Sequence, residues 1–576
     1  MTVPRLFLSQ IDMDFDPARD IAAGPWCFVD REDDFEGWDR LPFLDAFPDS
    51  SALVQVDALT RRLANQVALS WTDRMNAVTG RNFSPTMWRC FLSLWMVMAV
   101  QATWRCYCNI KLLVEHYGRN PLRVQVVKET PAWDIENVTD FVGLLSQDPS
   151  FIFWMNSLML RRVVPKSWIT EPVNCAVEIS PDEPEISVDT ITFKTRKPFS
   201  AFAGRLGFDH VQGTKLVRLF YGLLINVLPR HPASGRDFKP DDAVLKEFPN
   251  QYISILDEFL EATLPSSFGP GLLPILKQVE RLRFYPGRLT VTHAGSTDTR
   301  NQLINAFSVE YGERVVGFQH GGSYGVGLVE PWAVETEYAY HAFISWGWTK
   351  HADFYCNSIP LPSPMLSKIR NTHVTRNDRL IFVGAGMINY GRFDACPSPV
   401  RWLTYRENKQ IFVNSLSLGP REELCYRPRH QGAKQALQDG AYMKRYFPDL
   451  PTLDGELHDS LVKCRLLVLD YPGTTLHIAM AANVPTICYW DPCDWPLCKQ
   501  ANEQFDHLRK AKILFENPEE AAAHVNEIWH DVSSWWDTPE VQDARQVWQK
   551  CHALTSSIWW WSWAVGTWKL ATGREP

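Results

Sequence analysis

The chain has no long run of basic residues, and its 576 residues carry a formal net charge of −8. Proteins whose main partner is DNA or RNA present concentrated positive charge to the phosphate backbone. The charge balance therefore argues against nucleic acid as the main partner. It leaves room for a small anionic ligand, because a local group of arginines is enough to bind one.

The sequence also lacks the features of secretion and of a membrane span. Its amino terminus, MTVPRLFLSQIDMDFD, becomes acidic too early for a signal peptide. The longest apolar stretch, residues 90–104, is interrupted by Ser93 and Gln101 and is short for a bilayer span. This stretch is typical of a buried helix, and we expect a cytoplasmic protein.

Paired metal-ligand cysteines are missing too. The chain has 13 cysteines, an odd number, and no two of them have C-x₂-C spacing. This scatter is typical of reduced, buried thiols in a cytosolic protein. The motifs GxxxxGK[ST] and HExxH are also absent, which removes the usual support for a P-loop NTPase or a zinc peptidase.

Two stretches join an apolar, strand-like run to an abrupt, glycine-rich turn. They are GFQHGGSYG at residues 317–325 and LVLDYPGTT at residues 467–475. Parallel sheets of α/β enzymes place their ligand-binding loops at the carboxyl ends of strands. Two such turns, far apart in the sequence, predict two α/β units that face one cleft, as in a transferase that holds an activated donor between two halves.

Alternating strand-like and helix-like segments favour an α/β fold with parallel, doubly wound sheets. Residues 1–120 are predicted to be mostly helical after an initial strand. Residues 288–318 read as a β-α-β unit, and the prolines within residues 352–376 indicate an interdomain linker. The strand candidates of the second half are DRLIFVGAG, QIFVNSLSLG, ELCYRP, RLLVLDYPG, VPTICYWD and AKILFEN.

The first turn contains the candidate catalytic residue His320. An imidazole titrates near neutral pH, so it can act as a base or an acid. Gly321 and Gly322 let a ligand approach the backbone and leave peptide N–H groups to bind oxygens. We predict that both glycines bind the donor together with the flanking Gln319 and Tyr324. The alternative is a hydrogen-bonded histidine that only pins the turn.

Carboxylates near this turn are further candidates, since a carboxylate can be the nucleophile or base of sugar transfer. Asp298 follows the strand at RLTVTHAG, and Glu330, Glu335 and Glu337 follow the histidine turn. We select Asp298 and Glu330 as candidate catalytic residues. For each, a helix cap or a solvated charge is the alternative.

Three further groups are predicted to bind the donor. Arginine favours bidentate contacts to phosphate or carboxylate, and hydroxyls with free N–H groups at a helix amino terminus form an anion site. A solvated basic loop, simple N-capping by threonine and a polar loop are the respective alternatives. The groups are Arg427, Arg429 and His430 in YRPRHQG, Asp470, Gly473, Thr474 and Thr475 in DYPGTT, and Ser415 at the end of IFVNS.

Tryptophan is unusually frequent, with 24 residues, many of them near the carboxyl terminus in IWWWSWAVGTW. These rings are predicted either to pack a terminal helix onto the body of the protein or to anchor it at a membrane interface. Few basic residues flank the segment, which favours packing.

Several motifs together resemble a family of transferases encoded in bacterial surface-carbohydrate loci. The resemblance covers nearly the whole chain. The motifs are GPWCF, SWTDR, SPTMWRCFLSLWM, GFQHGGSYG with ISWGW, LVLDYPGTTLHIAMAANVPTICYWDP and the WW-rich tail.

Such proteins resemble GT-B glycosyltransferases and, more distantly, Kdo transferases and the glycerophosphotransferases of teichoic acid synthesis. The resemblance implies that the carboxyl-terminal domain holds the donor nucleotide and that the amino-terminal domain holds the acceptor. It also implies that YRPRHQG and DYPGTT contact the donor. Many GT-B enzymes hold the ribose with a glutamate at the position where this chain has Ile478, beside His477.

The resemblance and the residues together predict a GT-B-like α/β enzyme. Its expected parts are an acceptor-side Rossmann-like domain with a helical elaboration at residues 1–355, a donor domain at residues 377–552 and a tryptophan-rich helix at residues 553–576 that crosses back. The expected partners are a nucleotide-sugar donor, for which a CMP-activated acidic sugar is one candidate, and a glycan or lipid-linked acceptor. No metal or other cofactor is expected. Peripheral association with the inner face of the cytoplasmic membrane, transfer of glycerol phosphate and a non-catalytic scaffold stay open as alternatives.

Overall fold

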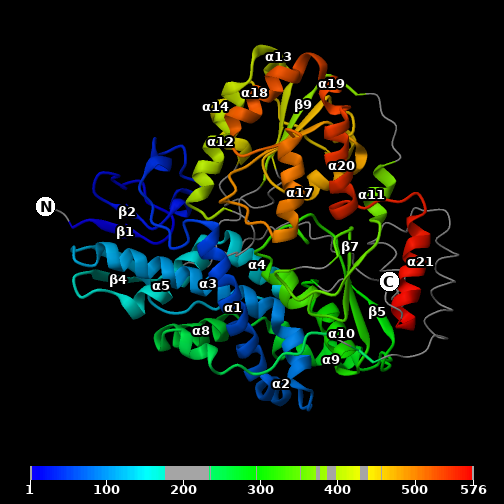
Figure 1. The fold of residues 1–576 in the computed structure, drawn as a ribbon. Helices are drawn as coiled ribbons and strands as arrows, with labels where there is room; N and C mark the ends of the chain where they lie inside the picture. The colour runs from blue at the N-terminus through cyan, green and yellow to red at the C-terminus, as the bar shows by residue number, and fades with distance from the viewer. Residues whose placement is uncertain are drawn as a thin grey trace.

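The computed structural model shows an α/β protein with three parallel sheets (Figure 1). The structure describes residues 3–175, 232–233, 235–292, 295–349, 352–370, 376–385, 397–428, 439–455 and 457–573. The sequence also predicts a loop at residues 172–196 and a long helical region at residues 210–283. Most of the first segment and the start of the second lie outside the described ranges.

The first sheet belongs to the amino-terminal region, and its strand β1 is the initial strand that the sequence predicted. Its strands have the order β2-β1-β3-β4. They are β1 (Arg5–Phe7), β2 (Ile21–Ala22), β3 (Arg123–Val127) and β4 (Ile169–Val173). The helices here are α1 (Ser50–Ser70), α2 (Thr72–Thr79), α3 (Pro85–Tyr117), α4 (Val138–Gln147) and α5 (Pro149–Val163). Helices α1, α2 and α3 confirm the mostly helical stretch predicted up to residue 120. Strands β2 and β4 were not predicted, because they are too short or too polar to give a strand pattern.

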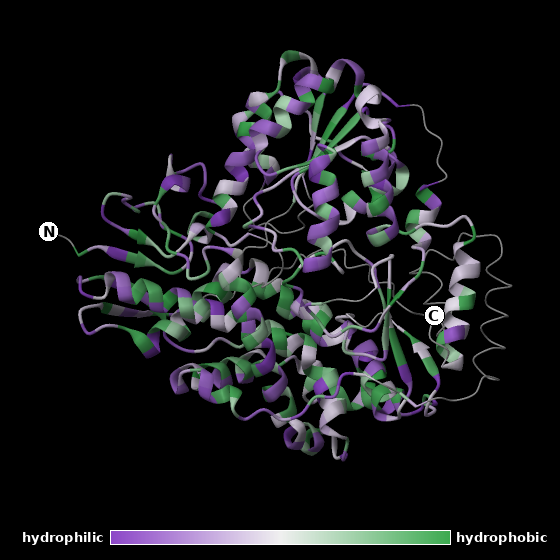
Figure 2. Cartoon of the chain, in the orientation of Figure 1, coloured by the Kyte–Doolittle hydropathy of each residue, from purple (hydrophilic) through white to green (hydrophobic). Residues whose placement is uncertain are grey.

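Helix α3 is the central element of this region, and hydrophobic residues occur along much of the ribbon there (Figure 2). Ser84 caps its amino terminus by accepting from the Met87 N–H, and Pro85 occupies the first turn. Residues on all sides of its middle are buried, as expected of a helix inside a large core. This confirms the prediction of a buried helix at residues 90–104. Across the described ranges, no helix combines the length and hydropathy needed to cross a bilayer.

The second sheet has the order β5-β6-β7-β8, and all its neighbours are parallel. Its strands are β5 (Leu289–Val291), β6 (Arg314–Phe318), β7 (Ala342–Ser345) and β8 (Ser358–Pro360). The chain before, between and after these strands forms α9 (Leu272–Val279), α10 (Thr299–Glu310), a π-helical turn (Ala333–Glu337) and α11 (Pro364–Ile369). The preceding helix, α8 (Asn250–Thr263), packs on α3 and α5 of the first region. The predicted linker at residues 352–376 is thus partly wrong, because it contains the edge strand β8 and the helix α11.

The third sheet has the order β10-β9-β11-β12-β13. Its strands are β9 (Leu380–Val383), β10 (Leu424–Arg427), β11 (Leu466–Leu469), β12 (Thr486–Tyr489) and β13 (Leu514–Phe515). The chain moves outward in one direction from β9 to β10 and in the other from β11 onward. This places the topological switch point, where open α/β sheets bind ligands, between the carboxyl ends of β9 and β11.

Helices cover both faces of the third sheet (Figure 1). They are α12 (Arg401–Ser415), α13 (Leu418–Glu422), α14 (Asp439–Tyr446), α15 (Leu457–Leu461), α16 (Thr474–Ala482), α17 (Lys499–Lys510), α18 (Pro518–Ile528), α19 (Val532–Trp536) and α20 (Pro539–His552). The predicted strand QIFVNSLSLG is wrong, because most of it is the end of α12. Phe412 and Val413 are buried there, and an apolar run this short does not distinguish a strand from a buried helix.

The tryptophan-rich helix α21 (Trp559–Thr572) crosses back and packs on the second sheet. Trp559 and Trp563 are buried in a cluster with Val316 and Ile344. Arg314 of β6, itself buried, donates hydrogen bonds to the Leu570 and Ala571 carbonyls at the end of α21. Two facing Rossmann-like sheets with a returning helix confirm the predicted GT-B-like α/β fold.

Ion pairs tie the amino-terminal region to the third sheet's helices. Arg406 of α12 pairs with Glu32 at 2.9 Å, and Arg445 of α14 pairs with the neighbouring Asp33. The Arg406 guanidinium is almost fully buried, so this contact is shielded from salt. The two halves therefore meet over a specific, partly polar surface.

Candidate active site

The two glycine-rich turns predicted to face each other are in direct contact. A Cβ atom placed on Gly322 would lie 2.3 Å from the Thr474 nitrogen and 2.5 Å from the Gly473 carbonyl carbon. His477, one turn into α16, contacts the Gly322 carbonyl oxygen through Nε2 at 2.7 Å. The turn after β6 and the turn after β11 thus form one site between the two units, as the sequence predicted.

Backbone pairing extends this contact beyond the turns. The Leu328 N–H donates to the Pro496 carbonyl at 2.8 Å, and the Cys498 N–H donates to the Val326 carbonyl at 2.9 Å. Gly327 and Leu497 form an antiparallel bridge. The segment after His320 therefore belongs structurally to both units, and its position depends on how they are docked.

His320 lies at the end of β6 in a cluster with a tyrosine and a carboxylate. Its Nε2 is 2.5 Å from the Tyr324 hydroxyl and 3.2 Å from Glu337 Oε1. The His320 side chain is 41% exposed, whereas that of Glu337 is 3% exposed. A buried carboxylate thus orients an accessible imidazole, which is the arrangement of a histidine base held by a third group.

Glu337 was among the four acids considered from the sequence but was not one of the two selected. The π-helical turn brings it back under the end of β5, where a Cβ on Gly295 would lie 3.1 Å from Glu337 Oε1. Single π-helical turns often mark functional sites. The sequence contains no local signal for such a turn, so the contact between Glu337 and His320 was not predictable.

The other acids have different surroundings. Asp298 caps α10 by accepting from the Asn301 N–H at 2.8 Å, so its helix-cap alternative is what the structure shows. Glu330 is half-buried near the tyrosines of the cluster. Glu335 is fully buried, and although burial raises its pKa, the charges of Arg89, Arg61 and Arg236 lower it overall. It holds α1 and α3 against the π-helical turn.

Gln319 and Tyr324 support the turn from inside. The Gln319 side chain donates to the Gly321 carbonyl at 2.9 Å and accepts from the Trp346 N–H and the Trp348 indole. Tyr324 stacks on Phe343 with ring centroids 5.4 Å apart. Burial, and then the charge of Glu337, raises the Tyr324 pKa well above its usual value. Both residues position His320 and the glycines.

Residues 321–325 have the spacing G-x-S-x-G, which in α/β-hydrolases marks a nucleophile between a strand and a helix. Here no helix follows β6 directly. The Ser323 carbonyl instead accepts from the Val326 and Gly327 N–H groups in a tight turn. This context does not fit a nucleophile elbow.

The amino terminus of α16 has the features of an anion site. Gly473 occupies the N-cap position, and it provides no side-chain cap. Thr474 is partly exposed and Thr475 is buried at the first two helical positions. The predicted alternative, N-capping by a threonine, is not what the structure shows. Uncapped N–H groups and the positive end of the helix dipole favour an anion there.

Asp470 is turned away from the turn and into the third sheet. It is 1% exposed, accepts from the Ala385 N–H at 3.1 Å and lies 3.5 Å from the Lys409 ammonium. Burial raises its pKa to about 6, and the Lys409 charge opposes this shift. Since Ala385 follows β9, Asp470 ties together the two strand ends at the switch point and makes the loop rigid.

Arg427 lies where it was predicted, at the carboxyl end of β10. One of its guanidinium N–H groups donates to the Leu453 carbonyl at 2.7 Å, and the side chain is half-buried. Arg429 and His430 lie outside the described residues.

Ser415 was predicted to join the donor site, but the structure places it elsewhere. Ser415 ends α12, which leads into the amino end of β10, and it is exposed there beside Asn526. In a parallel sheet this edge is opposite to the edge where β9, β10 and β11 end. Ser415 was placed at the site because it was predicted to end a strand, and that segment is the end of α12 instead.

Comparisons with known proteins agree with the resemblance seen in the motifs. Residues 4–565 match the LIC12162 family transferase. The chain belongs to this transferase family. Among solved structures it is similar to WaaG, a glycosyltransferase involved in lipopolysaccharide biosynthesis, with 10% identity over 59% of this chain and 86% of that one and a TM-score of 0.25. A TM-score this low does not establish a shared fold. No curated protein matches this LIC12162 family member in sequence.

Within the described part of this transferase, no three His, Cys, Asp or Glu side chains converge as metal ligands would. The functional groups brought together by the two turns are the His320 imidazole, the Gly321 and Gly322 peptides, and the hydroxyls and N–H groups that begin α16.

His477 has a structural role at this site that its sequence context did not predict. It is 1% exposed, and Trp548 Nε1 donates to its Nδ1 at 3.2 Å. Since Nδ1 accepts, the ring proton is on Nε2, which donates to the Gly322 carbonyl. Burial lowers the His477 pKa to about 4. A neutral imidazole thus joins α20, α16 and the histidine turn.

This burial predicts a measurable loss of stability in acid. The unfolded His477 titrates near pH 6.5, so its contribution is complete above that pH and is lost as pH falls from 6.5 toward 4. The contribution is at most about 3 kcal/mol. His477→Gln keeps an N–H donor for Gly322 and removes the titration. We expect a flatter dependence of the unfolding free energy on pH between 4.5 and 7.

Denaturant unfolding at several pH values measures this effect. His458→Gln is a suitable control, because it removes an exposed histidine. Equal pH slopes for the wild type and His477→Gln would show that His477 is not the group responsible.

Proposed function

We propose that this transferase moves a sugar from a nucleotide-activated donor to a hydroxyl of a glycan or lipid-linked acceptor. The proposal rests on one observation: a possible base and a possible anion site, which come from two different α/β units, lie next to each other. The accessible His320 imidazole comes from the second sheet, and the uncapped amino terminus of α16 comes from the third. A transfer reaction needs a base for the acceptor and an anion site for the leaving group.

His320 is proposed to take the proton of the acceptor hydroxyl. The hydroxyl oxygen forms a bond to the anomeric carbon, the bond from that carbon to the donor phosphate breaks, and the electron pair leaves with the phosphate. Glu337 stabilises the imidazolium that forms, since it lies 3.2 Å from Nε2. Asp298 is not needed in this scheme, and the half-buried Glu330 is a second candidate carboxylate.

The leaving phosphate is proposed to bind at the start of α16. Thr474 and Thr475 offer hydroxyls, and the first-turn N–H groups and the Gly321 and Gly322 peptides offer donors beside them. Preorganised donors of this kind stabilise charge that develops in the transition state, without reorganising. Arg427 adds a positive charge from the end of β10, and Arg429 and His430 are proposed to belong to the same group.

The donor nucleotide is proposed to occupy the switch point between β9 and β11. Ile478 is 3% exposed, so the position at which many GT-B enzymes hold the ribose cannot do so here. A panel of CMP-Kdo, CDP-glycerol, UDP-sugars and GDP-sugars tests the donor class by its effect on the melting temperature. A donor at 100 times its dissociation constant stabilises the fold by about 2.7 kcal/mol. CDP-glycerol as the one stabilising compound would favour glycerol phosphate transfer, and no shift by any compound would favour a scaffold.

Arg427→Ala is predicted to weaken binding of the donor found in this panel by about 1.5–3 kcal/mol, the range of a charge-assisted hydrogen bond. Isothermal titration gives the dissociation constant directly. Arg421→Ala is a matched control, because this exposed arginine of α13 lies at the opposite edge of the third sheet. An unchanged constant for Arg427→Ala would assign YRPRHQG to the solvated surface.

A further inference from the structure

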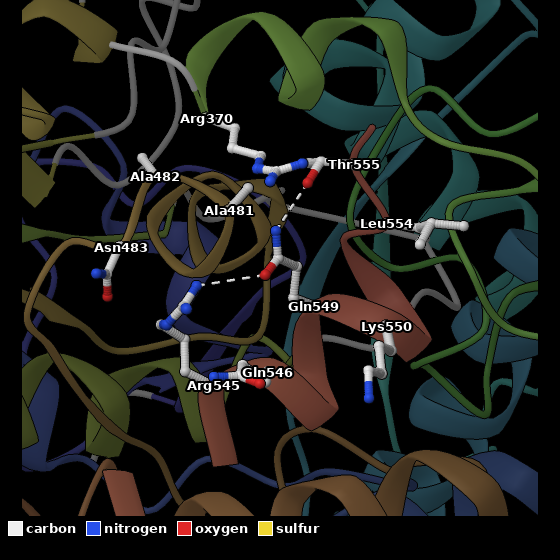
Figure 3. Close-up of a pocket in the computed structure, with 10 residues that line it drawn as sticks. All are labelled: Arg370, Ala481, Ala482, Asn483, Arg545, Gln546, Gln549, Lys550, Leu554 and Thr555. Carbon is white, nitrogen blue, oxygen red and sulfur yellow. Dashed lines mark hydrogen bonds between the residues drawn. The ribbon is translucent and has the colours of Figure 1, made fainter. Parts of the chain in front are cut away.

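A cavity of about 430 Å³ lies behind the contact between the two units. The end of α11, the carboxyl end of α16, α20 and the segment after α20 surround it (Figure 3). It is lined by Arg370, Ala481, Ala482, Asn483, Arg545, Gln546, Gln549, Lys550, Leu554 and Thr555. Since α16 begins at the candidate active site and ends here, the cavity is separate from that site.

The cavity is lined by three cations and by no carboxylate. Arg545 donates to the Met480 carbonyl at 3.0 Å, so it caps α16. It also donates to Gln549 at 3.3 Å (Figure 3). Burial, and then the charge of Arg370, lowers its pKa. The exposed side chains of Arg370 and Lys550 have no hydrogen bond or ion pair with the described residues. Positive charge without a partner favours a phosphate-bearing ligand.

Exposed apolar side chains follow the cavity along the chain. Ile558 is 52% exposed, Trp560 is 43% exposed and Trp561 is 51% exposed, although Trp559 and Trp563 of the same helix are buried. Ile558 is three residues after Thr555, so their Cα atoms are at most about 11 Å apart. The packing prediction for the tryptophan-rich tail thus accounts for two of these rings and leaves the other two in solvent.

Charge over the same region has one sign. The described residues 550–573 include Lys550 and Lys569 but no aspartate or glutamate. Tryptophan with neighbouring lysine or arginine is typical of surfaces at the membrane interface, where indole rings lie among the head groups and cations meet lipid phosphates. A protein partner would more commonly meet a larger apolar patch.

We propose that Arg370, Lys550, Ile558, Trp560 and Trp561 form a docking surface for an anionic lipid bilayer. The cavity takes the phosphate of a lipid head group, and the two indoles and the isoleucine enter the interface. The surface lies at the far end of α16 from the candidate active site, so docking does not cover that site. This inference goes beyond the proposed function and does not depend on the donor or on catalysis.

Sedimentation of the full chain with vesicles tests the proposal. We expect binding to vesicles of 70% phosphatidylcholine and 30% phosphatidylglycerol, and none to pure phosphatidylcholine. Each basic residue near an anionic surface strengthens binding about fivefold, so Arg370→Ala/Lys550→Ala should weaken it by about 30-fold. Trp560→Ala/Trp561→Ala should weaken it by about tenfold, since the rings contribute apolar area.

Lys111→Ala/Lys128→Ala is the matched control, because it removes two charges from exposed lysines on other parts of the chain. It should bind like the wild type. Wild-type binding by Arg370→Ala/Lys550→Ala, or equal binding to both vesicles, overturns the proposal. Stabilisation by inorganic phosphate without vesicle binding also overturns it, and assigns the cavity to a soluble phosphate. Circular dichroism confirms that each variant is folded, and a failure to bind any donor leaves these outcomes unaffected.

Discussion

Replacing His320 with alanine is expected to lower kcat for sugar transfer by about 100-fold or more, the usual contribution of a general base. The melting temperature should change little, because the imidazole is 41% exposed and its partners, Tyr324 and Glu337, are held by other contacts. Initial rates with the donor identified by thermal shift measure the effect. The structural alternative, a histidine that pins the turn, predicts loss of stability and activity together.

Glu337→Gln separates the base from the group that holds it. The amide keeps the shape of the side chain and removes the charge that stabilises an imidazolium 3.2 Å away. We expect a smaller loss of kcat than for His320→Ala, with unchanged donor binding. For His320→Ala, the control is His458→Ala, which also removes an exposed histidine. Full activity of folded His320→Ala would remove this residue from the mechanism and direct attention to Glu330.

The sequence was sufficient to predict the strands on which the site is built. β6 and β11 are uniformly buried and, apart from Arg314, apolar, and each ends at a glycine-rich turn. In a parallel sheet, such turns lie at the edge where the strands end. Burial on both faces makes such strands continuous hydrophobic runs, which are easy to recognise. The prediction that the His320 turn and the Thr474 turn face each other rested on the rule that ligand-binding loops follow the carboxyl ends of parallel strands.

Side-chain direction was the part that the sequence could not give. Asp470 and Thr474 are four residues apart in one turn, yet Asp470 is buried against Lys409 whereas Thr474 faces Gly321. Whether such a side chain is buried or faces the site depends on the side of the sheet to which it points. Similarly, Glu337 reaches His320 only through a π-helical turn, and Ser415 was misplaced because three apolar residues fit both a strand and a helix.

Gly322→Ala is expected to have the second large effect. Its Cβ would lie 2.3 Å from the Thr474 nitrogen and 2.6 Å from the Thr474 Cα. These are backbone atoms, so no side chain can rotate to make room. The two turns must separate by about 1 Å, and a misplacement of that size costs about 100-fold in catalysis. Overpacking should also cost about 1–3 kcal/mol of stability.

Gly321→Ala is the matched control, since it makes the same chemical change one residue earlier. A Cβ there would meet Tyr324 at 3.7 Å and Thr474 Oγ1 at 3.8 Å, which are ordinary contacts. Both substitutions keep the peptide N–H groups, so lost donors cannot explain a difference between them. The melting temperature should therefore fall for Gly322→Ala and stay near wild type for Gly321→Ala. Both glycines are predicted to bind the donor, so we expect kcat to fall for both variants and much further for Gly322→Ala. Equal behaviour of the two variants would mean that catalysis does not require the close approach of the turns, and that the His320 imidazole and the amino terminus of α16 act independently.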